Sequence, residues 1–151
     1  MRIGIDLGGT KIEGVLLDDS GKERARLRKP TPQGPYEDTI AAVSTMVGEL
    51  DAASSYRATT IGIGHPGAIS PATGLIKNAN STRLNGHPLD KDLERAMPGR
   101  RIRLSNDANC FAVSEAVDGA GAGYPTVFGV ILGTGVGGAI VIDRKPLVGA
   151  Q

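Results

Sequence analysis

The chain has 151 residues, a formal net charge of +1 and 40% hydrophobic residues, which is enough to build one well-packed core. The near balance of charges gives no electrostatic case for nucleic acid or an anionic membrane as a partner. No apolar run approaches the roughly 20 residues that a membrane helix needs. The single cysteine, Cys110, excludes an internal disulfide and a cysteine-rich zinc site in these residues, and we expect it to be small and buried.

The first predicted elements are two strands, at 2–7 and 12–18, that flank a glycine turn. Apolar and polar residues alternate before the turn, and apolar, partly β-branched residues follow it. Two adjacent glycines let backbone N–H groups approach a phosphate. A threonine and a lysine can add a hydroxyl group and a cation to such a site, and an aspartate can hold hydrated Mg²⁺ beside the phosphate. These residues are Asp6, Gly8, Gly9, Thr10 and Lys11. The alternative is an ordinary Gly-Gly hairpin that binds nothing.

The middle of the chain alternates between further strands and helices. Polar or proline-rich turns separate these segments, and apolar residues recur at helical spacing in the longer ones. The predicted elements are a strand at 22–28, a helix at 36–52, a strand at 59–63, a loop-rich stretch at 70–88, a helix at 89–97 and a strand at 101–104.

The strand at 101–104 runs into a polar junction. Ser105 or Asn106 can cap a helix predicted at 106–118, which puts Asp107 in the first helical turn. An acid at this position is either a helix-capping residue or a candidate general base.

A second glycine turn lies between apolar, strand-like runs at 127–132 and 139–143. Its glycines match the pattern G-x-G-x-x-G, but a dinucleotide fingerprint needs a helix next, and the β-branched run argues against one. We expect a second strand, turn and strand unit that binds phosphate. Its binding residues are Gly133, Thr134, Gly135, Gly137 and Gly138.

The two histidines and the basic run have simpler interpretations. We expect His65 to be structural or peripheral, and His87 to be a solvated loop residue. Between Lys22 and Lys29 the basic residues alternate with apolar ones, which favours a solvated strand face over a phosphate-binding patch.

Together the motifs resemble the ROK family (repressors, open reading frames and kinases), and within it the bacterial fructokinase-like sugar kinases. The matching segments, in family order, are Asp6–Lys11, Gly62–Gly67, Asn78–Thr82, Asn106–Asn109 and Gly133–Gly138. The resemblance runs along essentially the whole chain. It implies an α/β, ribonuclease H-like domain of the actin and hexokinase type, with the order βββ-α-β-α-β-α. In that fold group two phosphate-binding hairpins face each other across a cleft between two domains.

The resemblance implies transfer of the ATP γ-phosphoryl group to a hexose hydroxyl, with fructose as the first choice and glucose or an N-acetylhexosamine as alternatives. Both glycine turns would bind ATP, and Asp6 would hold Mg²⁺ through water. Asp107 would be the catalytic base. The sugar-binding residues would be Gly67, Asn80, Asn106 and Asp107. Asn78 or Ser81 can take the place of Asn80, and Gly67 is equally well explained as a turn glycine.

Kinases of this kind are longer than this chain, and the resemblance places a structural zinc site and further sugar ligands in a C-terminal half that is absent here. We expect an N-terminal domain at 1–118, followed at 119–151 by a hinge and the first hairpin of a truncated second domain. A lone hairpin is marginal in water, so pairing with another copy in a homo-oligomer is one expected way to cover it.

Two alternative hypotheses assign the chain to other classes of protein. A repressor of the same family needs an N-terminal helix-turn-helix, and Met1 lies one residue before the first strand. A non-catalytic nucleotide- or sugar-binding module fits the chain as it stands. Because Met1 leads directly into a strand, we expect no secretory signal and a cytoplasmic location.

Overall fold

The structure is a computed structural model, which describes residues 1–132 and 136–148. The chain divides into two compact units, unit 1 (Met1–Ser105) and unit 2 (Asn106–Gln151). The boundary between the units falls at the end of a strand, just before the helix that carries Asp107. The domain boundary expected at residue 118 stays a prediction.

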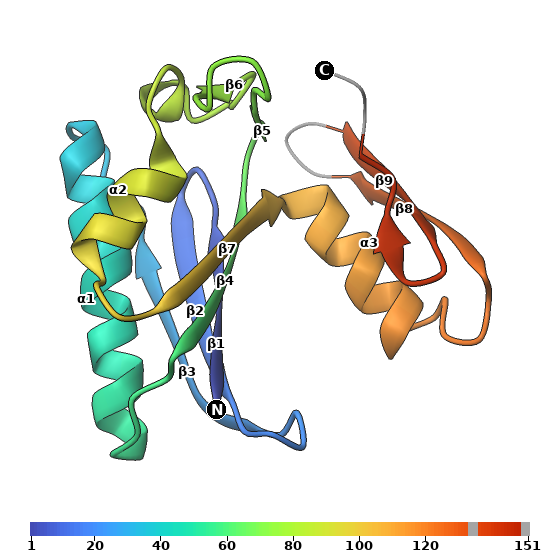
Figure 1. Ribbon diagram of the computed structural model, residues 1–151, viewed down its shortest axis with the longest axis horizontal. Coiled ribbons are helices and arrows are strands. Elements are labelled where there is room, and N and C mark those ends of the chain that lie inside the picture. The colour runs from blue at the N-terminus through green and yellow to red at the C-terminus, as the bar shows by residue number, and fades with distance from the viewer. Residues whose placement is uncertain (133–135, 149–151) are drawn as a thin grey trace. The chain divides into compact units, whose positions relative to one another are not determined.

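Unit 1 is built on a five-stranded sheet with the strand order β3-β2-β1-β4-β7 (Figure 1). The first three strands form an antiparallel meander, and β1 pairs with β4 in parallel. The glycine turn therefore follows the central strand β1, at the end of the sheet where β1 finishes. The strands are β1 (Arg2–Leu7), β2 (Lys11–Leu17), β3 (Glu23–Pro30), β4 (Thr60–His65) and β7 (Arg101–Asn106).

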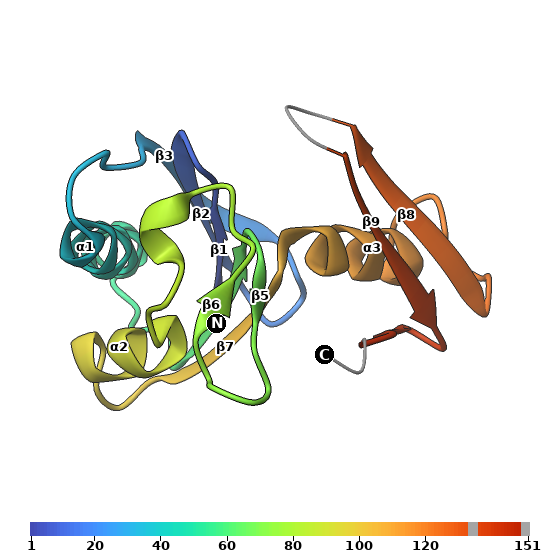
Figure 2. The ribbon, with the colours of Figure 1, turned by 90° about the horizontal axis from the view of Figure 1, so that it is seen from above.

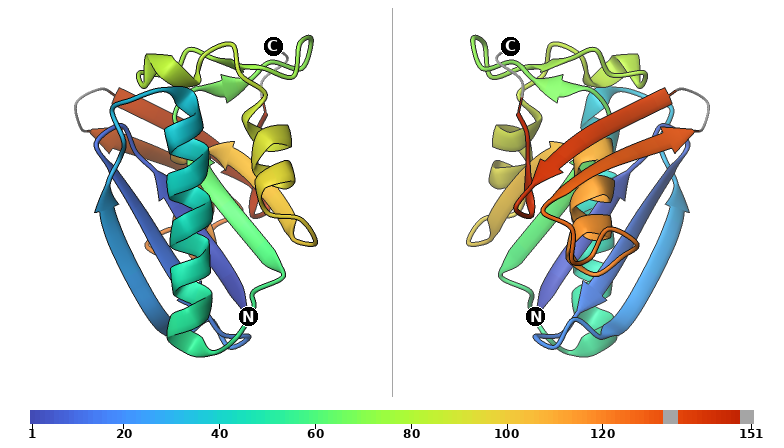
Figure 3. Two further views of the ribbon diagram at one scale, coloured as in Figure 1. Left: turned by 90° about the vertical axis from the view of Figure 1, so that its left-hand side faces the viewer. Right: turned by 90° about the vertical axis from the view of Figure 1, so that its right-hand side faces the viewer.

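One face of this sheet is covered by α1 (Tyr36–Ser54) and α2 (Leu89–Ala96) (Figures 1 and 3). Alternate residues of the strands point under these helices, so the apolar half of each alternating pattern is buried. Branched aliphatic side chains dominate the resulting core. Its fully buried members include Ile3, Leu7, Ile12, Leu16, Met46, Leu50, Ile61, Ile63 and Leu93.

Small elements fill the stretch between β4 and α2, as the loop-rich pattern predicts. A two-stranded sheet pairs β5 (Ala68–Ile69) with β6 (Ile76–Lys77), and a short 3₁₀ helix, η1 (Thr82–Leu84), follows. Ile76 and Leu84 are buried and attach this segment to the core of unit 1.

Unit 2 consists of α3 (Asp107–Val117) and a three-stranded antiparallel sheet with the order β10-β9-β8 (Figure 2). The strands are β8 (Thr126–Leu132), β9 (Val136–Ile142) and β10 (Lys145–Pro146). The second hairpin is therefore not isolated, because α3 packs on one face of it and β10 adds a strand. The small core between them is formed by Ala108, Ala112, Ala116, Ala139 and Val141.

The structure agrees with the predicted order of strands and helices and corrects two side-chain predictions. Cys110 is exposed, because the buried stripe of α3 falls on Ala108 and Ala112 instead. His87 is not simply solvated, because its ring stacks on Tyr36 with centroids 3.9 Å apart. The basic residues of β3 do line an exposed edge, where several pair with acidic neighbours.

None of the helices in the described ranges is long and apolar enough to cross a membrane.

Candidate functional site

The first glycine turn is closed by its own backbone. The amide of Gly8 donates a hydrogen bond of 3.0 Å to the carbonyl of Lys11. A Cβ atom at Gly8 would lie 2.7 Å from the same carbonyl oxygen, so the turn admits only glycine there. Asp6, two residues earlier on β1, is exposed.

The loop after β3 anchors three successive carbonyl groups of this turn. The hydroxyl of Thr31 donates to the carbonyl of Gly8 at 2.7 Å, and the amide of Thr31 donates to the carbonyl of Thr10 at 2.9 Å. The side-chain amide of Gln33 donates to the carbonyl of Gly9 at 3.2 Å. The orientation of the turn is thus fixed by residues that carry no recognisable motif.

These contacts also decide where the amide groups of the turn point. In a planar trans peptide the N–H and C=O groups are antiparallel. Because the carbonyls of Gly8 and Gly9 face the anchoring loop, the N–H groups of Gly9 and Thr10 face away from it. Both residues are exposed, so the turn can offer these donors to an anion.

Gly67 has a reason to be glycine within the protein itself. Its φ is +77°, a conformation that other residues rarely adopt. A Cβ atom there would lie 2.5 Å from the carbonyl oxygen of Lys77 and 2.7 Å from the amide nitrogen of Ala79. The turn after β4 therefore packs tightly on the segment after β6, and a role of Gly67 toward sugar stays a prediction.

The segment Asn78–Thr82, which carries the predicted sugar contact Asn80 and is called the predicted sugar loop below, is shaped by Asn85. Its side chain accepts a hydrogen bond from the amide of Ala79 at 2.9 Å and donates one to the carbonyl of the same residue at 3.1 Å. Asn78 and Asn80, on either side of Ala79, are exposed, while Ser81 is buried. Asn80 is therefore accessible for the predicted sugar contact.

Within unit 1 the structure brings the predicted sugar loop to the glycine turn. A Cβ atom at Gly9 would lie 3.0 Å from the hydroxyl oxygen of Ser81. A guanidinium nitrogen of Arg83 donates to the carbonyl of Gly9 at 3.4 Å. Two segments that the sequence links only through family order are thus in contact.

In unit 2, Asp107 is the first residue of α3 and is exposed. Of the two caps that the sequence allows, the structure has Asn106, whose side-chain oxygen accepts from the amides of Ala108 at 3.0 Å and Asn109 at 3.4 Å. This hydrogen bonding holds the helix start. The sugar contacts of Asn106 and Asp107 stay predictions.

The second glycine turn lies partly outside the described residues, which exclude the predicted phosphate-binding residues Gly133, Thr134 and Gly135. Gly137 and Gly138 lie in β9. A Cβ atom at Gly137 would be 3.5 Å from that of Ala108, so the start of β9 lies beside the first turn of α3.

The residues present suit a magnesium ion that is held mainly by nucleotide phosphates. Across the described ranges, no group of three or more His, Cys, Asp or Glu side chains is arranged to hold a metal. Mg²⁺ usually keeps several waters and needs one or two carboxylates beside substrate phosphates. The exposed carboxylate of Asp6, next to a turn with outward-facing amides, meets that requirement.

Four residues with structural roles here were not predicted from the sequence: Thr31, Gln33, Arg83 and Asn85. All of them act on main-chain groups, which every residue carries, so no residue pattern identifies them. The one available signal is Thr31, a hydroxyl residue that stands between two prolines.

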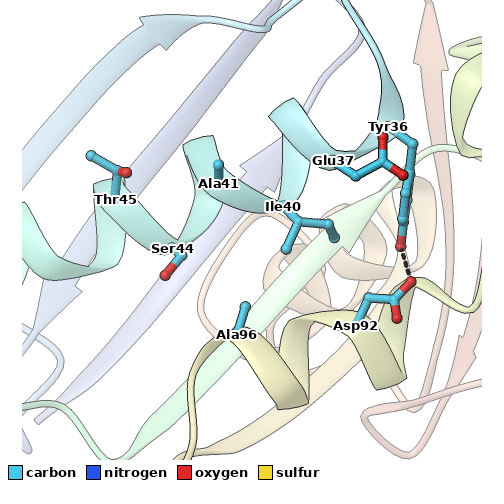
Figure 4. A pocket seen from close by; sticks show the side chains of 8 residues that line it. All are labelled: Tyr36, Glu37, Ile40, Ala41, Ser44, Thr45, Asp92 and Ala96. Carbon is cyan, nitrogen blue, oxygen red and sulfur yellow. Dashed lines mark hydrogen bonds between the residues drawn. The ribbon is translucent and has the colours of Figure 1, made fainter.

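A concavity of about 550 Å³ lies between α1 and α2 (Figure 4). The hydroxyl of Tyr36 donates to Asp92 at 2.9 Å across one end of it. Burial raises the pKa of Tyr36, and the hydrogen bond to Asp92 raises it further. Its lining consists of Tyr36, Glu37, Ile40, Ala41, Ser44, Thr45, Asp92 and Ala96. None of these residues was predicted as a site residue, and the pocket belongs to the packing of the two helices.

The meander, the parallel strand and the covering helices define an α/β domain of the ribonuclease H-like, actin and hexokinase type. The fold matches a glucokinase of the ROK family from Streptomyces griseus, solved with glucose and AMPPNP, with a TM-score of 0.85 and 30% identity over 98% of this chain and 46% of that one. The chain belongs to the ROK family, which it matches over residues 2–151.

Curated relatives agree with this assignment. An N-acetyl-D-glucosamine kinase of Pasteurella multocida is 41% identical over 145 residues, which are 96% of this chain and 47% of the relative. One from Citrobacter koseri is 43% identical over 151 residues, all of this chain and 49% of the relative. The chain thus spans about half the length of the curated relatives it matches.

Proposed function

We propose that this chain is the N-terminal half of an ATP-dependent sugar kinase that phosphorylates a hexose, with an N-acetylated hexosamine as the preferred acceptor. The observation that carries the proposal is the anchored glycine turn in contact with the loop of Asn80 and Ser81, in a chain that belongs to the ROK family. The turn suits phosphate and the loop suits sugar hydroxyls.

The choice of sugar rests on the relatives. Those of 41% and 43% identity are N-acetyl-D-glucosamine kinases, which supports an N-acetylhexosamine over the fructose that the sequence motifs alone favoured. Glucose is the second candidate, because the Streptomyces griseus structure contains glucose.

In the proposed reaction a sugar hydroxyl oxygen forms a bond to the γ-phosphorus of ATP, and the bond from that phosphorus to the β,γ-bridging oxygen breaks. ADP leaves with the bond's electrons, and Asp107 accepts the hydroxyl proton. Phosphoryl transfer depends on positioning and charge stabilisation more than on a strong base. The amides of Gly9 and Thr10 would bind phosphate oxygens, Asp6 would hold hydrated Mg²⁺, and Asn80 and Asn106 would orient the sugar.

We propose that the 151-residue chain by itself binds nucleotide or sugar but does not catalyse phosphoryl transfer. It spans about half of its relatives' length, so a non-catalytic nucleotide- or sugar-binding module is the second candidate function for the isolated chain. We expect negligible sugar-dependent ADP release from it. Release at the rate of a complete kinase would contradict this view.

The proposal is tested with the full-length kinase that carries these residues. ADP release is measured with N-acetylglucosamine, N-acetylmannosamine, glucose, mannose and fructose as acceptors. We expect the highest kcat/KM for an N-acetylated hexosamine. A preference for fructose would contradict the assigned sugar, and no release with any acceptor would contradict the kinase function.

The role of Asp107 is tested in the same protein. Asp107→Asn should lower kcat by at least about 10², the size of a lost general base, with little change in the KM for ATP. Asp118→Asn is the matched control, because Asp118 is an exposed residue at the other end of α3. Equal turnover of the two variants would remove Asp107 from the catalytic role.

A further inference from the structure

Arg83 joins the glycine turn to the loop that carries the predicted sugar contacts. One of its terminal nitrogens donates to the carbonyl of Gly9 at 3.4 Å, and the other donates to the side-chain oxygen of Gln33 at 3.3 Å. Gln33 in turn donates to the same carbonyl of Gly9 at 3.2 Å. Arg83, Gln33 and the Gly9 carbonyl therefore form a closed triangle, each in contact with the other two.

The triangle controls one peptide plane. A carbonyl that accepts from two side chains is held in direction, and the N–H group of the same peptide must point the opposite way. For the carbonyl of Gly9, that group is the N–H of Thr10. The side chains that donate to the carbonyl of Gly9 therefore determine the direction of the Thr10 N–H, which is one of the amides proposed to bind phosphate.

The side chain of Arg83 is suited to this task. Its planar guanidinium carries several N–H groups in a fixed fork, so it can reach two acceptors at once, which the single ammonium of lysine does less well. The Nε atom is buried and meets no acceptor in the part of the chain that the structure describes. The polar contacts of Arg83 are thus made by its two terminal nitrogens, both of them in the triangle.

We propose that Arg83 is a positioning residue, which fixes the Gly9–Thr10 peptide for phosphate binding and makes that peptide dependent on the sugar loop. The proposal rests on the proposed kinase function for its effect on ATP. Arg83 lies in η1, within three residues of Asn80. A shift of the loop around Asn80 therefore reaches Gly9 directly through this side chain.

The first test needs no kinase activity. Backbone ¹⁵N relaxation is measured on the 151-residue chain, its Arg83→Met variant and the control Arg95→Met, since Arg95 is an exposed residue of α2 paired with Asp92. In Arg83→Met we expect the order parameter of the Thr10 amide, which belongs to the Gly9–Thr10 peptide, to fall from about 0.85 to below about 0.6. The order parameters of the residues in β1 and β2 should be unchanged in both variants. An unchanged order parameter at the Thr10 amide in Arg83→Met would overturn the proposal.

The second test uses the full-length kinase. Arg83→Met should raise the KM for ATP by about tenfold and leave the dissociation constant of the sugar within about twofold. Arg83→Lys should be intermediate. A loss of sugar affinity with a normal KM for ATP would show that Arg83 only supports the sugar loop, and full recovery by lysine would exclude a role for the guanidinium fork.

The two tests fail independently. An inactive full-length protein would contradict the proposed function, while the relaxation data would still decide whether Arg83 holds the turn.

Discussion

The two units bury apolar surface in opposite ways. Unit 1 puts large branched side chains such as Leu50 and Ile61, both fully buried, between its sheet and two helices. Unit 2 packs α3 on its sheet through alanines, and its largest apolar side chains face outward, with Phe128 68% and Leu132 80% exposed.

The difference follows from the residues at the contact. Gly129 of β8 faces Ala112 of α3, and a Cβ atom at Gly129 would lie 2.7 Å from that of Ala112. Small residues allow the helix to approach the sheet closely, but they remove little apolar area from water. Unit 1 therefore has the larger hydrophobic contribution to stability, and it also contains the anchored glycine turn.

The largest expected effect is on the core of unit 1. Leu50→Ala should lower the free energy of unfolding by about 2–5 kcal/mol, because it removes buried methyl groups and leaves a cavity. Urea denaturation of the 151-residue chain measures the loss. Leu147→Ala, at an exposed position of unit 2, is the control and should change it by less than about 0.5 kcal/mol. Equal losses would refute the contrast between the two units.

The next effect is on the close contact in unit 2. Gly129→Ala should cost about 1–3 kcal/mol, because the added methyl overlaps Ala112 and forces α3 away from β8. Gly62→Ala is the control, since a Cβ atom there meets no atom within 4 Å. Amide hydrogen exchange in α3 and β8 measures the change. Loss of protection in unit 1 instead would contradict the division into units.

A smaller effect is expected at the junction of α1 and α2. Tyr36→Phe removes the hydrogen bond to Asp92 and should cost about 1 kcal/mol. The raised pKa of Tyr36 also predicts a pH dependence. Its contribution to stability is complete below the unfolded pKa of about 10 and is lost as the pH rises above it, because the native state holds the proton longer. Thermal unfolding from pH 8 to 11 should show a shallower decline in Tyr36→Phe, and parallel declines would contradict this.

The smallest effect on stability is expected at the outer face of unit 2. Phe128 and Ile140 are exposed cross-strand neighbours on that face. Replacing both with lysine should change the free energy of unfolding by less than about 0.5 kcal/mol and reduce self-association, since exposed apolar patches promote it. Sedimentation velocity compares this variant with Thr126→Lys, which adds charge without removing apolar surface. Unchanged association would show that this face is not responsible.

The sequence by itself determined the strands and helices and the location of the first glycine turn. Alternation at 2–7 and 12–18, helical spacing in 36–52 and the polar junction at Asp107 are local signals, and the structure has strands or helix starts at each of them. These features depend on neighbouring residues only, so they are visible without the fold.

Only the tertiary structure decided how the turn is held and which residues hold it. Arg83 donates to Gly9, which lies 74 positions earlier in the sequence, and to Gln33, which lies 50 positions earlier. His87, expected in solvent, meets the ring of Tyr36, and Gly67 meets the backbone of Lys77. Such contacts join common residue types to main-chain or ring surfaces, and chain folding alone brings them together, so no pattern along the sequence can specify them.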